Sequence, residues 1–104
     1  MVRRKIKWSN DAKNDLFNIL DFYIERNRSK TYSIKLNREI NKSIQQIVRN
    51  PNLGIKTDFD SVWSLITSDY QIIYEIFEQL ILVILIWDCR RNPDDTKIGK
   101  RIAG

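Results

Sequence analysis

Few residues in this sequence could carry out acid–base or nucleophilic chemistry. Histidine is absent, which removes the usual general base, the usual zinc ligand and every Ser–His or Cys–His pair. Arg90 and Arg91 form an adjacent guanidinium pair that could bind a phosphate or a carboxylate, and Tyr70 adds one phenol. These groups do not make an acid–base set, so we name Arg90, Arg91 and Tyr70 only as weak catalytic candidates. We expect no metal and no cofactor.

The net charge of +5 is unevenly distributed along the 104 residues. Residues 1–56 hold thirteen basic residues against five acidic ones, and residues 89–104 hold five against two. Residues 57–88 hold six acidic residues and no lysine or arginine. A charged partner should therefore meet the first half of the chain or its end. No apolar run suits a membrane span or a signal peptide, and a single cysteine fits a reducing compartment, so we expect a cytoplasmic protein.

The N-terminal half is predicted to form a strand and a helical hairpin. Residues 3–8 alternate between polar and apolar side chains as a strand does, and Ser9 suits the N-cap of a helix. Apolar stripes then predict two helices, at about 9–26 and 29–49, with Ser29 or Thr31 capping the second. Because the link between them is short, the helices should lie antiparallel.

The C-terminal half is predicted to form a sheet. Residues 50–61 are rich in turn-forming side chains and indicate a loop. The last extended run is apolar throughout, which favours a central strand covered on both faces. The whole chain, residues 1–104, is predicted to be one α+β domain in which the hairpin packs on one face of a small, mostly antiparallel sheet. The three strands of the predicted meander are residues 62–67, 70–77 and 80–87.

Several aromatic and sulfur-containing side chains have structural and functional interpretations. Tyr70 and Tyr74 share one face of their strand, where core packing is favoured over catalysis. The alternation of side chains along its strand differs for Trp63, which could be an exposed binding anchor. Cys89 is expected to be a buried or half-buried free thiol, since no histidine could activate it.

Four short motifs follow one another along the chain: Ile6–Ala12 with Asp15-Leu16, Asn50-Pro51-Asn52-Leu53-Gly54, Tyr70-Gln71-Ile72-Ile73-Tyr74 and Trp87–Pro93. In this order and at this spacing they resemble the RelE/ParE toxin superfamily over about residues 5–95. The resemblance implies a toxin of a bacterial type II toxin–antitoxin module, which a cognate antitoxin neutralises by wrapping around it. The RelE-like branch cleaves mRNA on the ribosome, whereas the ParE-like branch inhibits DNA gyrase.

The meander favours the ParE-like branch. RelE-like nucleases resemble one another in placing Lys and Arg there, but the matching residues here are Val62, Ser64 and Gln71, with Gln71 in the place of the usual arginine. An acidic meander would repel a polyanion, and the long hairpin is also similar to that of ParE-like toxins. We therefore favour a toxin that binds a protein such as gyrase. A ribosome-dependent mRNA endonuclease and a degenerate module that only binds antitoxin remain as alternatives.

Two basic surfaces are predicted to bind partners. Lys35, Arg38 and Lys42 on the second helix would receive an acidic antitoxin segment that folds on contact, although a solvated helix face is the plainer interpretation. The target would meet the basic residues near the C-terminus, where residues 96–104 are expected to be a mobile tail that orders on binding. These target-binding candidates are Arg90, Arg91, Lys97, Lys100 and Arg101.

Overall fold

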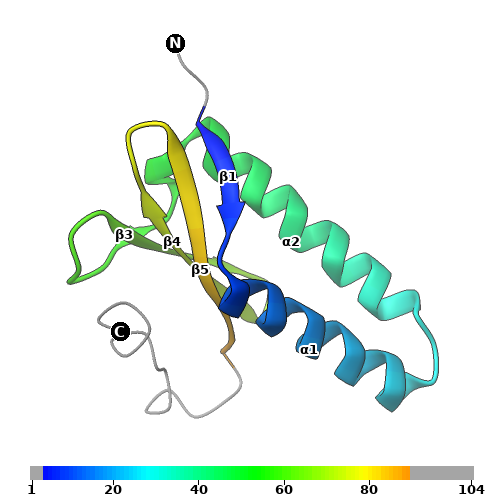
Figure 1. The fold of residues 1–104 in the computed structure, drawn as a ribbon. Coiled ribbons are helices and arrows are strands. Elements are labelled where there is room, and N and C mark those ends of the chain that lie inside the picture. The colour runs from blue at the N-terminus through cyan, green and yellow to red at the C-terminus, as the bar shows by residue number, and fades with distance from the viewer. Residues whose placement is uncertain (1–3, 90–104) are drawn as a thin grey trace.

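A computed structural model describes residues 4–89, and its architecture is the predicted α+β class (Figure 1). A strand is followed by two long helices and then by a sheet that is mostly antiparallel. Arg90, Arg91 and the predicted tail lie outside the described residues. The elements are β1 (Lys5–Trp8), α1 (Asn10–Asn27), α2 (Thr31–Arg49), the 3-10 turn η1 (Pro51–Leu53), β2 (Ile55–Lys56), β3 (Val62–Thr67), β4 (Tyr70–Ile76) and β5 (Leu80–Asp88).

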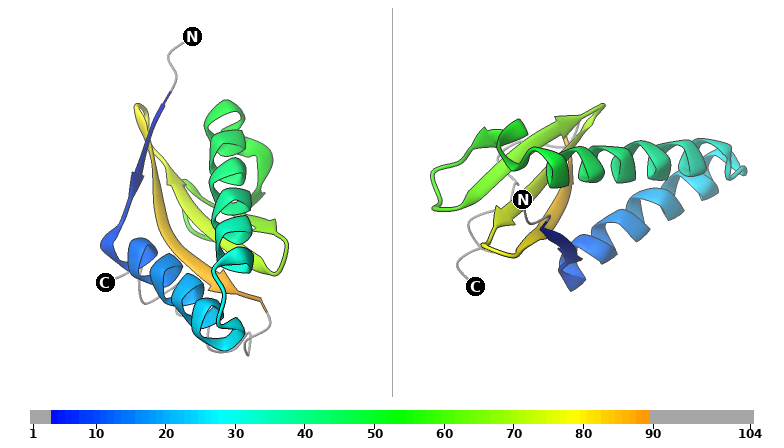
Figure 2. Two further views of the ribbon diagram at one scale, coloured as in Figure 1. Left: turned by 90° about the vertical axis from the view of Figure 1, so that its right-hand side faces the viewer. Right: turned by 90° about the horizontal axis from the view of Figure 1, so that it is seen from above.

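The sheet has the strand order β1-β5-β4-β3-β2, so the apolar strand β5 lies at its interior. β1 runs parallel to β5, whereas the other neighbours are antiparallel. The helical hairpin lies across one face, and its far end extends beyond the sheet (Figure 2). β2 was not predicted, because a pair of two residues inside a turn-rich loop has no periodicity to detect.

Apolar side chains fill both faces of β5, as predicted. Ile72 and Tyr74 of β4 belong to the cluster under the helices, so Ile73 between them points to the opposite face. There Ile73 packs with Leu85 and Ile84 in a second cluster. A β-bulge allows the consecutive residues Ile84 and Leu85 to join the same cluster. The β4–β5 register shifts between Ile73 and Tyr74 and leaves Ile84 as an extra residue of β5.

Ser9 joins the end of β1 to the start of α1. Its Oγ accepts a hydrogen bond from the amide of Ala12 at 3.0 Å, which confirms the predicted N-cap. The same hydroxyl donates to the carbonyl of Ile84 at 2.8 Å. Six residues later, Asp15 Oδ2 accepts a hydrogen bond from the amide of Ile86 at 3.1 Å. The N-cap Ser9 and Asp15 of α1 therefore bind the β5 backbone beyond the point where β1 ends.

The link between the helices differs from its prediction. Arg28 ends α1 in the left-handed region, with φ 50° and ψ 36°. The N-cap of α2 is Lys30, which makes no side-chain capping bond, so the predicted cap at Ser29 or Thr31 is wrong. The Ser29 hydroxyl accepts a hydrogen bond from the amide of Thr31, the first residue of α2, at 3.2 Å. The tight left-handed turn moves the helix start past Ser29.

Candidate functional site

The second and third motifs meet at the hydroxyl of Tyr74. This hydroxyl donates to the carbonyl of Pro51 at 2.7 Å and accepts from the amide of Gly54 at 3.2 Å. A Cβ built on Gly54 would lie 2.4 Å from the carbonyl oxygen of Ser64, so only glycine fits there. Burial raises the pKa of Tyr74, an effect that the bond from Gly54 partly opposes. These motif residues hold the loop against the sheet.

The meander residues that would be basic in a RelE-like nuclease form a neutral pair. Gln71 Nε2 donates to Ser64 Oγ at 2.6 Å, on the sheet face turned away from the helices. Val62, the third matching position, is 1% exposed and belongs to the outer apolar cluster. The pair is therefore held in place by its own hydrogen bond, with no cation on the meander to neutralise a phosphate.

Tyr70 is completely buried in the core beneath the helices. This burial favours the core-packing interpretation over contact with a substrate. Trp63 is half-buried and packs against the same core, so it is not the exposed anchor that its alternation suggested. Its partner strand sets this orientation, because Trp63 pairs with Tyr74 and points to the helix side.

Cys89 is exposed, which corrects the expectation of a buried or half-buried thiol. It follows β5 directly, one residue past the last strand pair at Asp88, and its amide donates to the carbonyl of Asp69 at 2.7 Å. Partial desolvation raises the pKa of the thiol, and the carboxylates of Asp88 and Asp69 raise it further. The thiol is thus less reactive as a nucleophile than a free cysteine at neutral pH.

The sheet face away from the helices mixes apolar groups with charges of both signs. Lys7 of β1 and Glu75 of β4 both pair with Leu82 and so flank it on this face. Toward the other edge, the exposed fractions of Ile55 and Ile66 are 72% and 61%. Such a face is better suited to a protein surface than to a polyanion.

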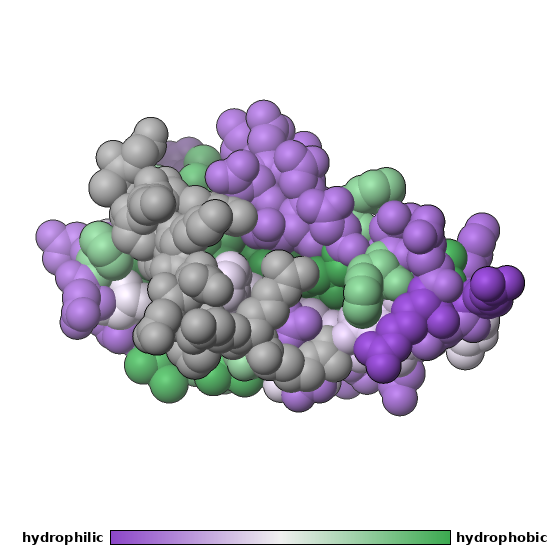
Figure 3. All heavy atoms as spheres, turned by 90° about the horizontal axis from the view of Figure 1, so that it is seen from below, coloured by the Kyte–Doolittle hydropathy of each residue, from purple (hydrophilic) through white to green (hydrophobic). Residues whose placement is uncertain are grey.

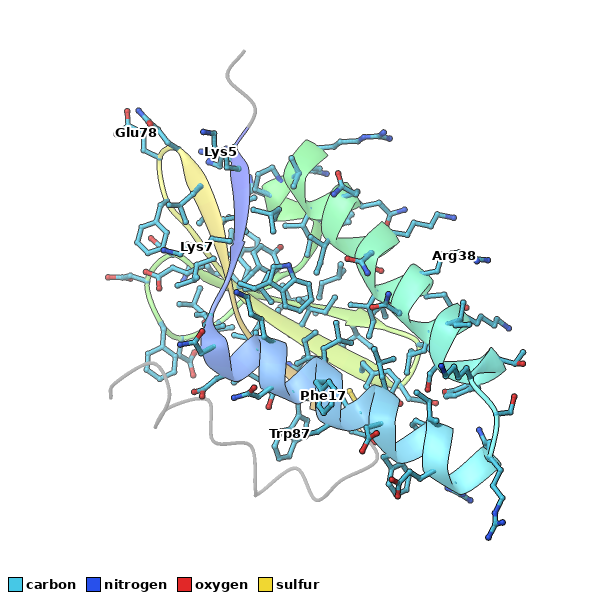
Figure 4. All side chains as sticks on the ribbon, turned by 45° about the vertical axis from the view of Figure 1, so that its right-hand side comes forward. Lys5, Lys7, Phe17, Arg38, Glu78 and Trp87 are labelled. Carbon is cyan, nitrogen blue, oxygen red and sulfur yellow. The ribbon has the colours of Figure 1, made fainter. Side chains whose placement is uncertain are left out.

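Lys35, Arg38 and Lys42 lie together on α2. All three are exposed, and their spacing of three and four residues aligns them along one side of the helix. Arg38 points away from α1 and from the sheet (Figure 4). The stripe is therefore opposite the buried face of α2. The target-binding candidates Arg90, Arg91, Lys97, Lys100 and Arg101 lie outside the described residues.

A groove that the sequence did not reveal lies between the two helices and the end of β1. It encloses about 370 Å³, and Phe17 at its side is 67% exposed (Figure 4). The available signal was that Phe17 falls outside the apolar stripe of its helix, where a large aromatic side chain has no core to enter. The groove is lined by Trp8, Lys13, Leu16, Phe17, Leu20, Asn37 and Asn41.

Solved structures with this arrangement belong to toxin–antitoxin systems. The chromosomal ParDE system from P. aeruginosa matches with a TM-score of 0.67 and 19% identity, covering 81% of this chain and 94% of that one. The RelBE2 toxin–antitoxin complex from Mycobacterium tuberculosis matches with a TM-score of 0.58 and 12% identity, covering 82% of this chain and 96% of that one. The YoeB dimer from Staphylococcus aureus matches with a TM-score of 0.53 and 21% identity, covering 79% of this chain and 92% of that one. The fold is therefore that of the RelE/ParE toxins.

Residues 6–93 match the family described as the ParE toxin of the type II toxin–antitoxin system, parDE. The chain belongs to the ParE toxin family. No curated protein sequence matches it significantly. The prediction of a type II toxin with a cognate antitoxin as partner is confirmed. Within residues 4–89, neither helix has the length and apolar character needed to cross a membrane.

Proposed function

We propose that this toxin arrests growth by binding a protein target, and that DNA gyrase, the target implied by the resemblance to ParE-like toxins, is that protein. The observation that carries the proposal is the neutral Gln71–Ser64 pair at 2.6 Å on the meander. Cleavage of RNA through its 2′-hydroxyl needs a base, an acid and a cation near the phosphate. Gln71 and Ser64 supply none of these at neutral pH.

The surroundings of this pair support a protein partner. Ile66 lies opposite Gln71 across the β3–β4 ladder and is 61% exposed, and Ile55 lies opposite Ser64 and is 72% exposed. Covering such side chains stabilises a protein complex by about 25 cal/mol for each Å² of apolar surface removed from water. A phosphate backbone would gain nothing from them.

A translating extract tests the absence of nuclease activity. We expect that mRNA recovered after addition of the purified toxin will show no new 5′ ends within codons when mapped by primer extension. The physical reason is the lack of any lysine or arginine between residues 57 and 88. Codon-specific cuts that disappear in the Gln71→Ala or Arg90→Ala variant would restore the nuclease interpretation.

We further propose that the stripe of Lys35, Arg38 and Lys42 docks an acidic segment of the cognate antitoxin. All three side chains are exposed on one side of α2, so the stripe offers three positive charges without rearrangement. The groove beside Phe17 lies between α1 and α2, on a different side of α2 from the stripe, so the antitoxin would have to cross over the helix to fill both surfaces.

Reversing these three charges to glutamate should slow antitoxin association about tenfold and reduce its dependence on salt, because electrostatic steering acts mainly on the association rate. Stopped-flow or surface-based kinetics at two salt concentrations would measure both effects. The control reverses Lys5 and Lys7, two exposed bases of β1, and so changes the net charge in the same direction at another place. An unchanged rate and salt slope in the α2 variant would contradict this docking surface.

A further inference from the structure

The free end of the helical hairpin carries an exposed aromatic cluster. This end of the hairpin lies beyond the sheet, away from the β4–β5 turn (Figures 1 and 2). Tyr23, 8% exposed, contacts Phe22 and Tyr32 edge-on, with ring centroids 5.0 and 4.7 Å apart. The outer two rings remain 55% and 36% exposed. We call residues 22–32 the hairpin tip.

The hairpin tip is positively charged. It contains Arg26, Arg28 and Lys30 against the single acid Glu25. None of the three bases forms an ion pair or a side-chain hydrogen bond within residues 4–89. The first turn of α2 holds no acidic residue, so nothing on that helix offsets its positive N-terminal dipole. Seen from below, deep purple hydrophilic side chains stand beside pale green apolar ones at this end (Figure 3).

A hollow of about 290 Å³ lies within the tip, lined by Tyr23, Arg26, Asn27 and Tyr32. Its walls combine two phenol rings, a guanidinium group and a carboxamide. This set can hold a carboxylate side chain by a charge-assisted hydrogen bond while the rings pack against its aliphatic part. Tyrosine and arginine are also the residues most enriched at the energetic centres of protein interfaces.

The tip departs from what helix stability alone would favour. Arg28 holds the left-handed conformation with φ 50°, which glycine adopts at lower cost. Lys30 occupies the N-cap, where an uncharged or acidic side chain would bond the free amides. Positions 28 and 30 thus carry basic side chains where a glycine and a capping side chain would stabilise the helices better. Such departures from local stability are common at functional surfaces.

We infer that the hairpin tip is a contact surface for the protein target and receives an acidic segment of it, with a carboxylate in the hollow beside Arg26. The inference rests on the proposed function and adds a second region to the predicted C-terminal surface. Charge complementarity argues for an acidic protein segment, and a hollow with one guanidinium group beside two phenol rings favours a protein over a nucleic acid, which would need a longer row of cations.

Full-length variants test the tip. Arg26→Glu with Arg28→Glu should weaken inhibition of purified DNA gyrase about tenfold, and Phe22→Ala should weaken it roughly threefold to tenfold. Arg28→Gly should raise the melting temperature by roughly 4 °C, through relief of the left-handed strain, yet inhibit less well. Phe77→Ala, 42% exposed in the β4–β5 turn, and Arg49→Glu at the end of α2 are the matched controls.

Growth arrest and antitoxin binding by the same variants separate the outcomes. Tip variants that inhibit gyrase like the wild type would overturn the inference and leave the proposed function standing. If the wild type itself leaves gyrase active, the proposed function fails, and growth arrest then decides the tip: arrest lost with antitoxin binding kept supports it, and arrest kept overturns it. Tip variants that no longer bind the antitoxin would also overturn the inference. So would tip variants whose only loss is binding of a DNA duplex.

Discussion

Replacing Gly54 with alanine is expected to lower the free energy of unfolding by about 3 kcal/mol. The new Cβ would lie 2.4 Å from the carbonyl oxygen and 2.8 Å from the carbonyl carbon of Ser64. These are backbone atoms of β3, which is paired on both sides, so neither can move aside freely. The φ of Gly54 is −80°, an ordinary value, so the cost arises from the close approach and not from backbone conformation.

Urea unfolding followed by tryptophan fluorescence would measure this loss. Tyr74→Phe is the matched control, because it removes the two hydrogen bonds that the Tyr74 hydroxyl makes with the same loop without adding an atom, and should cost about 1–2 kcal/mol. If Gly54→Ala were less destabilising than Tyr74→Phe, the loop would not be held as tightly against Ser64 as its geometry indicates.

Deleting residues 96–104 is expected to abolish growth arrest while antitoxin binding is retained. The deletion removes Lys97, Lys100 and Arg101 and leaves Arg90 and Arg91, so the predicted C-terminal surface loses three of its five bases. Electrostatic attraction to an acidic partner should weaken accordingly. The fold should persist, because the helices and the sheet already form both apolar clusters within residues 4–89.

Induced expression with and without the antitoxin would measure this effect, beside a variant in which the three bases become alanine. Similar losses in both would assign the effect to charge, and a loss in the deletion alone would assign it to the remaining residues of the segment. A truncated toxin that still arrests growth at the wild-type level would show that the target surface lies elsewhere.

Most of the fold followed from hydrophobic periodicity, because each long element buries one regular face. The stripes of α1 and α2 and the unbroken apolar run of β5 were sufficient to predict the hairpin on one face of the sheet. The short strand β2 and the helix link escaped prediction. They depend on a close approach at Gly54 and on a left-handed Arg28, and neither leaves a periodic signal in the sequence.

The site was less predictable, because the motifs that carry the resemblance are largely structural. Ser9 caps α1 and binds the β5 backbone, while Gly54 and Tyr74 hold a loop. Phe17 and Phe22 were overlooked because a stripe defines which residues are buried, not which remaining aromatic side chains gather on a surface. Their signal was the presence of large apolar residues outside the stripe of α1.

Supercoiling of relaxed plasmid DNA by purified gyrase is the most direct test of a protein target. We expect that adding the toxin alone, with no RNA or ribosome present, will inhibit the reaction, and that pre-incubating the toxin with its cognate antitoxin will restore it. The Gln71→Ala variant should still inhibit, because binding a protein target requires no acid, base or cation at this position. Undiminished supercoiling at toxin concentrations well above those that arrest growth would contradict gyrase as the target.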